Sequence, residues 1–204
     1  MAYAPWLVPS KNSGSGNDTV SFSANSQNTG RNARSTNVTF SAVNVQDVIV
    51  VPTQAGKPEF ASFNSNTAAV EKTGGTLTLS GTSNSSKLTF SKGTDNIGLT
   101  IPASYTAAGL NIQNGAAITG DPGAAAQFNW SIQFSVPANT SVDPLTCQIV
   151  VTDDAGHTHT CTITLAAGDA YLSVSPLSVE IPWDGSTSVS VSVASNTNWY
   201  IPTE

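Results

Sequence analysis

Residues 188–193, Ser-Val-Ser-Val-Ser-Val, alternate strictly between a hydroxyl and a branched apolar side chain. Successive side chains of a β-strand point to opposite faces, so Val189, Val191 and Val193 share one face and the serines the other. The same alternation, or a longer apolar run, marks residues 19–24, 36–40 and 46–51. Such segments recur about every 8–12 residues between clusters of Gly, Pro, Asn and Ser, which predicts an all-β fold.

The composition excludes several classes of protein. Hydrophobic residues make up 39% of the 204 residues, enough for a buried core, but charged residues make up only 10%. The seven Lys and Arg residues are scattered and the net charge is −6, so the basic patch typical of nucleic-acid binding is missing. No apolar stretch approaches the length of a membrane span. We therefore expect neither nucleic acid nor a membrane as partner.

The N-terminus has no basic region followed by an apolar one, so it does not resemble a secretory signal. Either a leader is absent from this sequence, or the protein is used without Sec export.

A continuous domain is expected over residues 57–168, after a hinge at residues 56–58. Its predicted strands are residues 75–80, 87–90, 98–101 and 128–134, followed by a hairpin of residues 146–152 and 158–165. Residues 105–126 have weak strand character and predict a long excursion with a turn at residues 120–123 and one helical turn. Trp130 shares its strand face with other large apolar residues, which predicts a core position.

The two ends of the chain look like parts of one further sandwich in reversed order. Residues 169–204 supply opening strands that stop at Trp199, whereas residues 1–56 begin without an opening. Half a sandwich leaves a bare apolar face and unpaired strand edges. We therefore predict that the halves complete each other, either within one chain or between neighbours. The residues expected at this seam are Trp6, Val20, Phe22, Val38, Phe40, Val189, Val191, Val193 and Trp199.

These terminal segments resemble the BACON domain, an Ig-like sandwich. The opening part of the resemblance is carried by Leu172-Ser173-Val174-Ser175-Pro176, Val179, Gly185-Ser186, Val189-Ser190-Val191, Ser195-Asn196 and Trp199. The closing part is carried by Trp6-Leu7-Val8, Ser13-Gly14-Ser15-Gly16, Val20-Ser21-Phe22, Asn25, Gly30, Arg31, Arg34, Val38-Thr39-Phe40 and residues 51–56. The resemblance implies two Ig-like modules, one continuous and one assembled from the terminal segments.

The resemblance also implies a function. BACON domains occur in carbohydrate-active proteins of gut Bacteroidetes and in virion proteins of crAss-like phages. The resemblance implies that this chain is a non-enzymatic structural protein of such a virion. It would be either an auxiliary or decoration capsid protein or the base of a head fibre. The expected partners are the major capsid protein or other virion proteins and further copies of the chain. The protein would assemble in the host cytoplasm and leave by lysis.

The alternative is a module that binds carbohydrate, such as host or mucus glycans. Trp183 follows a proline at a strand end and is the aromatic residue expected to face solvent and contact a sugar. One exposed aromatic is normal on a protein surface, so this support is weak.

No catalytic residue, cofactor or metal site is expected. His157, His159 and Cys161 share one strand parity near Asp153 and Asp154. Residues with i, i+2 spacing on a single hairpin are weak evidence for a metal site. A polar hairpin tip is the favoured interpretation.

The two cysteines of the hairpin predict reduced core thiols. A disulfide competes with that interpretation if Val151 faces His157, since Cys147 then lies opposite Cys161.

Overall fold

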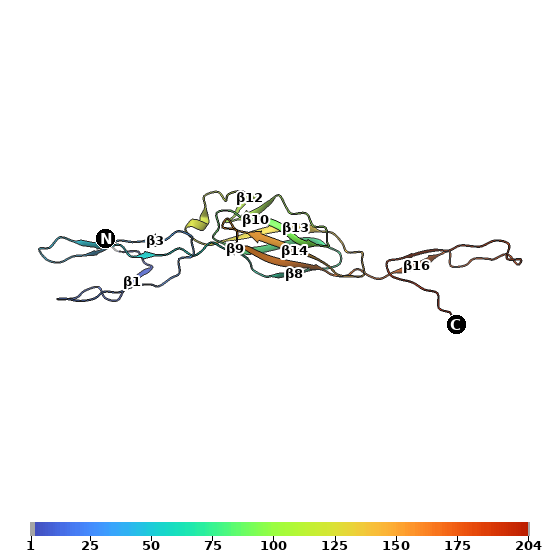
Figure 1. Cartoon of the computed structure of the whole chain (residues 1–204), viewed down its shortest axis with the longest axis horizontal. Coiled ribbons are helices and arrows are strands. Elements are labelled where there is room, and N and C mark those ends of the chain that lie inside the picture. The colour runs from blue at the N-terminus through green and yellow to red at the C-terminus, as the bar shows by residue number, and fades with distance from the viewer. Residues whose placement is uncertain (1–2, 204) are drawn as a thin grey trace.

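The computed structural model describes residues 3–203 and shows an all-β protein with several antiparallel sheets (Figure 1). At its centre a five-stranded sheet packs against a four-stranded one. The five-stranded sheet contains, in spatial order, β12 (Leu110–Gln113), β11 (Ser104–Ala107), β13 (Phe128–Val136), β9 (Gly75–Ser83) and β7 (Ala61–Phe63). The four-stranded sheet contains β10 (Thr89–Asp95), β14 (Leu145–Thr152), β15 (Thr158–Leu165) and β8 (Thr67–Val70).

The core lies between these two sheets because their strands alternate in polarity. Phe128, Trp130, Ile132, Phe134 and Val136 of β13 are all buried, and the residues between them face outward or lie half-buried. The prediction that Trp130 belongs to the core is confirmed. Burial of this alternating face is the main source of stability for the central sandwich.

The loop after β10 differs from the prediction of a strand over residues 98–101. Asp95 Oδ1 accepts hydrogen bonds from the backbone N–H groups of Ile97, Gly98 and Leu99. A carboxylate that bonds three successive N–H groups curls the chain and removes the donors that a strand ladder needs. Leu99 is still buried, so its apolar side chain reflects a core position without a strand.

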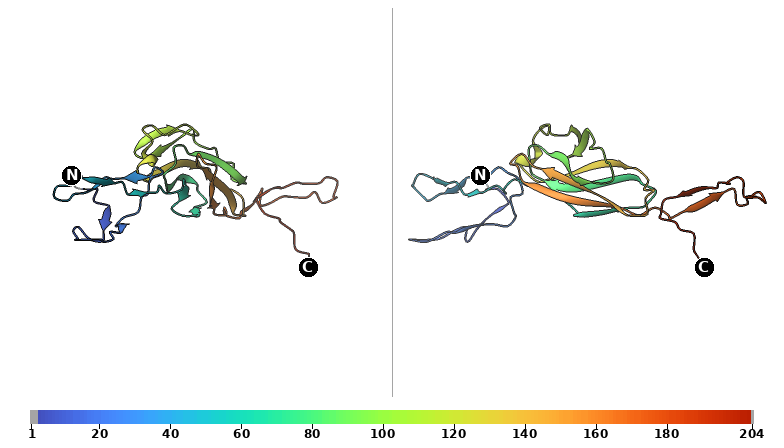
Figure 2. Two further views of the ribbon diagram at one scale, coloured as in Figure 1. Left: turned by 60° about the vertical axis from the view of Figure 1, so that its left-hand side comes forward. Right: turned by 45° about the vertical axis from the view of Figure 1, so that its right-hand side comes forward.

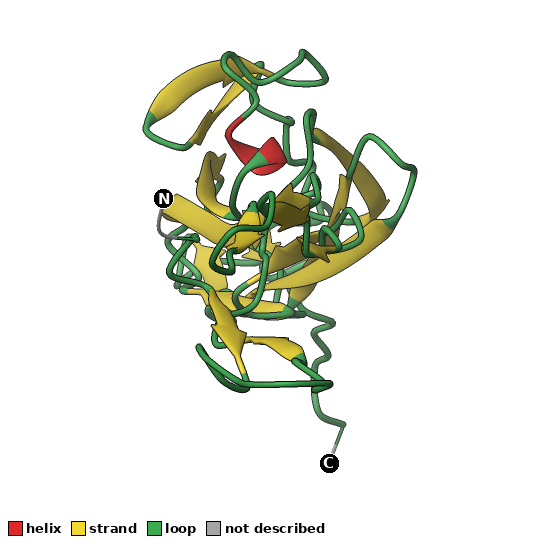
Figure 3. Ribbon diagram, turned by 90° about the vertical axis from the view of Figure 1, so that its left-hand side faces the viewer, coloured by secondary structure: helices red, strands yellow, loops and turns green. Residues whose placement is uncertain are grey.

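Four further strands of the central sandwich are absent from the prediction: β7, β8, β11 and β12. β7 and β8 were not expected, and β8 is short and pairs with β15 in parallel. The excursion over residues 105–126 contains the unexpected β11–β12 hairpin, and the predicted helical turn is the 3-10 turn η1 (Pro122–Ala124), shown in red in Figure 3.

The cysteine register decides between the two alternatives left open by the sequence. Val151 pairs with His159 rather than His157, so Cys161 lies opposite Ile149 and Cys147 lies opposite Ile163. Both cysteines are buried and free.

The terminal segments lie at opposite ends of the central sandwich (Figures 1 and 2). The N-terminal segment holds three small strand pairs: β1 (Leu7–Pro9) with β2 (Phe22–Ala24), β3 (Arg34–Ser35) with β6 (Thr53–Gln54), and β4 (Val38–Phe40) with β5 (Val48–Val50). The C-terminal segment holds one hairpin, β16 (Leu172–Ser175) with β17 (Ser192–Ser195). Within one chain the two halves therefore do not meet.

Two strand predictions fail in these segments. Residues 46–51 were expected to be covered on both faces, but every residue of β5 is exposed. Of residues 188–193, only Ser192 and Val193 belong to β17. Both stretches lack a neighbouring sheet in the single chain.

Among the described residues, none of the helical segments has the length and apolar character needed to span a membrane.

Candidate binding groove

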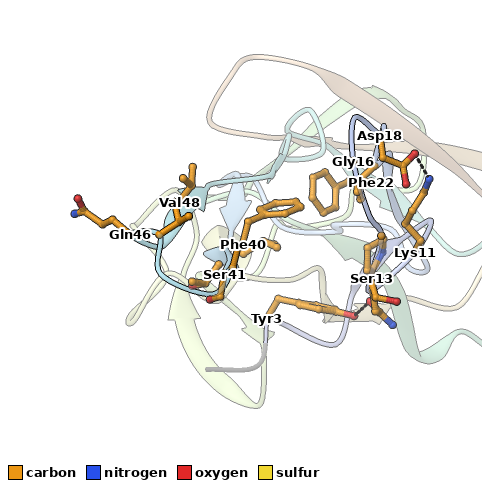
Figure 4. Close-up of a pocket in the computed structure, with 18 residues that line it drawn as sticks. Tyr3, Lys11, Ser13, Gly16, Asp18, Phe22, Phe40, Ser41, Gln46 and Val48 are labelled. Atoms are coloured by element: carbon orange, nitrogen blue, oxygen red, sulfur yellow. Dashed lines mark hydrogen bonds and ion pairs between the residues drawn. The ribbon is translucent and has the colours of Figure 1, made fainter.

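An open groove of about 730 Å³ lies in the N-terminal segment (Figure 4). Phe22 of β2 and Phe40 of β4 line it, and their rings meet edge to face with centroids 6.5 Å apart. Val20, Val38 and Val48 add further apolar lining. Two separate strand pairs thus present apolar side chains to a shared hollow.

One side of the groove is polar. Lys11 Nζ lies 2.6 Å from Asp18 Oδ1, and the N–H of Thr19 donates to the same oxygen. These two hydrogen bonds, the one from Lys11 first, hold the pKa of Asp18 below its usual value. The Tyr3 hydroxyl donates to Asn12 Oδ1 at 3.2 Å. The groove therefore combines an aromatic floor with a charged, hydrogen-bonding rim.

The N-terminal segment has almost no hydrophobic interior of its own. Within residues 3–56 the buried apolar side chains are Leu7 and Val38. Phe40 is 39% exposed. Beyond it, the exposed apolar residues of this segment are Val8, Val43, Val45, Val48, Ile49, Val50 and Val51.

The structure brings together four of the predicted seam residues. Val20, Phe22, Val38 and Phe40 all line the groove. Trp6 lies apart from them, beneath the Arg34 guanidinium, whose carbon is 4.9 Å from the ring centroid. The remaining predicted seam residues lie in the C-terminal segment at the other end of the sandwich: Val189, Val191, Val193 and Trp199. Their contact with the groove residues of another chain stays a prediction.

A set of polar contacts fixes the N-terminal segment on the central sandwich. The Arg31 guanidinium pairs with Asp121, and Arg31 Nε donates to the Asn84 carbonyl at 2.6 Å. A Cβ on Gly30 would fall 2.3 Å from the Ala125 backbone, so this close approach requires glycine. Asn84 carries no local pattern that predicts this role, because its partners lie more than twenty residues away in the sequence.

A second set of contacts holds the C-terminal hairpin at the opposite end. Asn196 Nδ2 donates to the carbonyls of Asp169 at 2.8 Å and Thr140 at 3.0 Å. Asn196 Oδ1 accepts from the Tyr171 N–H. A Cβ on Gly168 would meet the Asn139 carbonyl oxygen at 2.4 Å. Both terminal segments are thus seated on the central sandwich by buried or backbone-directed bonds.

Trp183 occupies a tight turn in the C-terminal segment. The Gly185 N–H donates to the Pro182 carbonyl at 3.0 Å, and Asp184 Oδ1 accepts from the Ser186 N–H. Trp183 is 98% exposed. The expectation that this side chain faces solvent is met.

The histidines and cysteines near the β14–β15 hairpin lie in separate environments. His157 Nδ1 is 2.8 Å from Asp153 Oδ2, whereas the His159 ring lies against Phe63. Burial, with the neighbouring Asp95 carboxylate, raises the pKa of Cys147 to about 12, so its thiol is a poor nucleophile. Within the part of the chain that the structure describes, no three His, Cys, Asp or Glu side chains gather as metal ligands.

Comparison with known proteins gives one family match, to the N-terminal segment. Residues 1–55 match the BACON family, described as "Putative binding domain, N-terminal". The resemblance of the N-terminal segment is thereby confirmed, and the BACON match covers none of residues 170–204. The resemblance of those C-terminal residues stays a prediction.

No curated protein matches the chain. The similar solved structures include two endo-fucoidan hydrolases of glycoside hydrolase family 107, at 14% and 11% identity and a TM-score of 0.30 each. They also include the extracellular cadherin domains 1–4 of protocadherin Gamma B7, at 12% identity and a TM-score of 0.38. The alignments cover 81%, 82% and 72% of this chain but only 22%, 27% and 36% of those chains. The chain therefore spans about a fifth to a third of these structures' length.

Proposed function

We propose that this chain is a non-enzymatic, Ig-like binding protein and that carbohydrate is its ligand class. The match of residues 1–55 to a family described as a binding domain carries this proposal. The buried, weakly nucleophilic cysteines and the dispersed histidines support a binding role over a catalytic one.

Trp183 is the side chain best placed to contact a sugar. Its indole ring is held clear of the protein on a turn that Asp184 and Gly185 stabilise. An exposed aromatic face provides a large apolar contact for a sugar ring, and Asp184 beside it supplies hydrogen-bond acceptors.

A glycan array with the intact protein tests the proposal. We expect binding to one or more polysaccharides that Trp183→Ala abolishes. Tyr200→Ala is the matched control, because Tyr200 is an exposed aromatic residue of the same segment. An array without hits contradicts the proposal, and binding that survives Trp183→Ala contradicts the role given to Trp183.

A structural role in a phage virion is the second candidate. The observation that favours it is the placement of incomplete β segments at opposite ends of a well-packed sandwich, which suits a link in an assembly (Figure 1). In this role the chain would sit on the virion as an auxiliary capsid protein or head-fibre base, bound to other virion proteins. Mass spectrometry of purified particles that encode the chain should then find it, and its absence from them removes this candidate.

A further inference from the structure

We propose that the C-terminal segment of a second copy, residues 170–203, fills the groove of the N-terminal segment, so that copies join head to tail. The occupant is a second copy of this chain, and the inference is independent of any glycan ligand. Four observations support it: an uncovered acceptor, an uncovered donor, a separation that prevents closure within one chain, and opposite charge.

The acceptor is the apolar groove of the N-terminal segment. Phe22 and Phe40 line an open hollow, and β5 beside it is exposed along its whole length. A folded monomer seldom leaves contiguous apolar surface of this kind in water, and where it does the surface usually marks an interaction site. The edges of these small strand pairs also carry backbone groups that another strand can bond.

The donor is the C-terminal segment, which is equally incomplete. None of its described residues 169–203 is buried. Val189 and Val191 are each 43% exposed and continue the alternation that ends in β17 at Val193. A strand with valines on one face and serines on the other requires an apolar surface opposite the valines.

One chain cannot bring its own donor to its own acceptor. The acceptor is seated beside Asn84 through Arg31, and the donor is seated at the other end through Asn196. β9 runs between the two ends from Gly75 to Ser83, and a nine-residue strand spans about 30 Å. Figures 1 and 2 show the two segments pointing away from each other in different views.

The two segments also carry opposite formal charge. Residues 1–56 contain three basic and two acidic residues, which gives +1. The donor, residues 170–203, contains two acidic residues, Glu180 and Asp184, and no basic residue, which gives −2. Opposite charge favours the encounter of donor with acceptor and disfavours the pairing of two donors. The favoured contact is therefore heterologous, and such contacts form open chains or closed rings.

Two double variants test the donor and the acceptor independently. Val189→Asp with Val191→Asp disables the donor, whereas Phe22→Asp with Phe40→Asp disables the acceptor. The matched control is Ser188→Asp with Ser190→Asp, which adds the same charge to the opposite strand face. Thermal unfolding followed by circular dichroism verifies that the central sandwich, which holds the hydrophobic core, stays folded in each variant.

Light scattering after size exclusion, over a range of concentrations, measures the molar mass of the species that each variant forms. We expect the intact chain and the serine-face control to form species larger than the 20.9 kDa monomer, with mass rising with concentration. Each disabled variant alone should stay monomeric. A mixture of the two should stop at a 1:1 dimer, because one groove and one donor segment remain functional between them.

Other outcomes overturn the proposal. An intact chain that stays monomeric at every concentration contradicts it directly. Association that both disabled variants retain indicates contact through another surface, and a mixture that stays monomeric shows that the two segments do not bind each other. A glycan array is read separately, so loss of glycan binding leaves this result unaffected.

Discussion

Phe22 and Phe40 meet edge to face in the groove, with ring centroids 6.5 Å apart and planes inclined at 78°. They come from different strand pairs, β2 and β4, so their contact links the two sides of the N-terminal segment. Phe40 nevertheless remains partly exposed. The pair stabilises the shape of the groove without closing it, and this leaves an aromatic surface for an incoming strand.

Phe40→Ala is expected to weaken head-to-tail association about fivefold, because the ring is 39% exposed and burial of that apolar surface by an incoming strand contributes about 1 kcal/mol. Sedimentation velocity over a range of concentrations measures the change. Val43→Ala is the control, because Val43 is exposed and lies outside the groove lining. Equal association of both variants with the wild type would show that the Phe22–Phe40 pair takes no part in the contact.

Asn84→Ala is expected to release the N-terminal segment from the central sandwich. Asn84 is fully buried; its Oδ1 accepts from the Phe60 N–H at 2.9 Å, and its Nδ2 donates to the Lys57 and Pro58 carbonyls. Removing the amide leaves these backbone groups without hydrogen-bond partners, and each such group costs about 1–3 kcal/mol of stability. Limited proteolysis should then cleave near residues 26–35 faster than in the wild type.

Asn64→Ala is the control for that experiment, because the Asn64 amide bonds Ser80 on an exposed surface. Protection of residues 26–35 that is the same in Asn84→Ala and in the wild type would contradict the role assigned to Asn84.

Asn196→Ala should loosen the C-terminal hairpin while leaving the central core intact. Three hydrogen bonds, to Asp169, Thr140 and Tyr171, disappear together. Because Asn196 is partly accessible, we expect a loss of about 1 kcal/mol in the stability of this junction. Hydrogen exchange of β16 and β17 amides measures it, with Asn198→Ala as control. Unchanged exchange in these strands would count against the proposed anchor.

The sequence predicted those features that depend on local alternation. Val20, Phe22, Val38 and Phe40 could be grouped in advance because each lies on the apolar face of a strand predicted from the sequence, and all four line the groove. The seating of the segment could not be predicted, since Arg31 finds its partners at Asn84 and Asp121 only after the sandwich has formed. Long-range backbone contacts leave no periodic pattern in the chain.

Asp95 is expected to make the stability of the sandwich sensitive to acid. Burial alone would raise its pKa, but the bonds from Lys92 and the N–H of Gly98 outweigh burial and lower the pKa to about 2. A pKa lowered in the folded state contributes stability above the unfolded value of 3.8, and that contribution is lost as pH falls from there toward 2. The expected contribution is about 2 kcal/mol at neutral pH.

Urea unfolding between pH 2 and 7 measures this dependence, and Asp95→Asn should flatten it. Asp143→Asn is the control, because Asp143 is an exposed loop residue. An equally steep fall in stability in Asp95→Asn would assign the acid sensitivity to other carboxylates.

The two cysteines should resist both modification and oxidation in the folded protein. Burial comes first among the causes that raise the pKa of Cys147 to about 12, and burial also raises the pKa of Cys161. Thiolate, the reactive form, is therefore scarce. The register places Cys147 opposite Ile163 and Cys161 opposite Ile149, so the thiols are not direct cross-strand partners. A thiol reagent should label neither cysteine in buffer and both in denaturant, and mild oxidant should leave the labelling in denaturant unchanged. A disulfide formed in the native state would mean that the β14–β15 register differs from the one described.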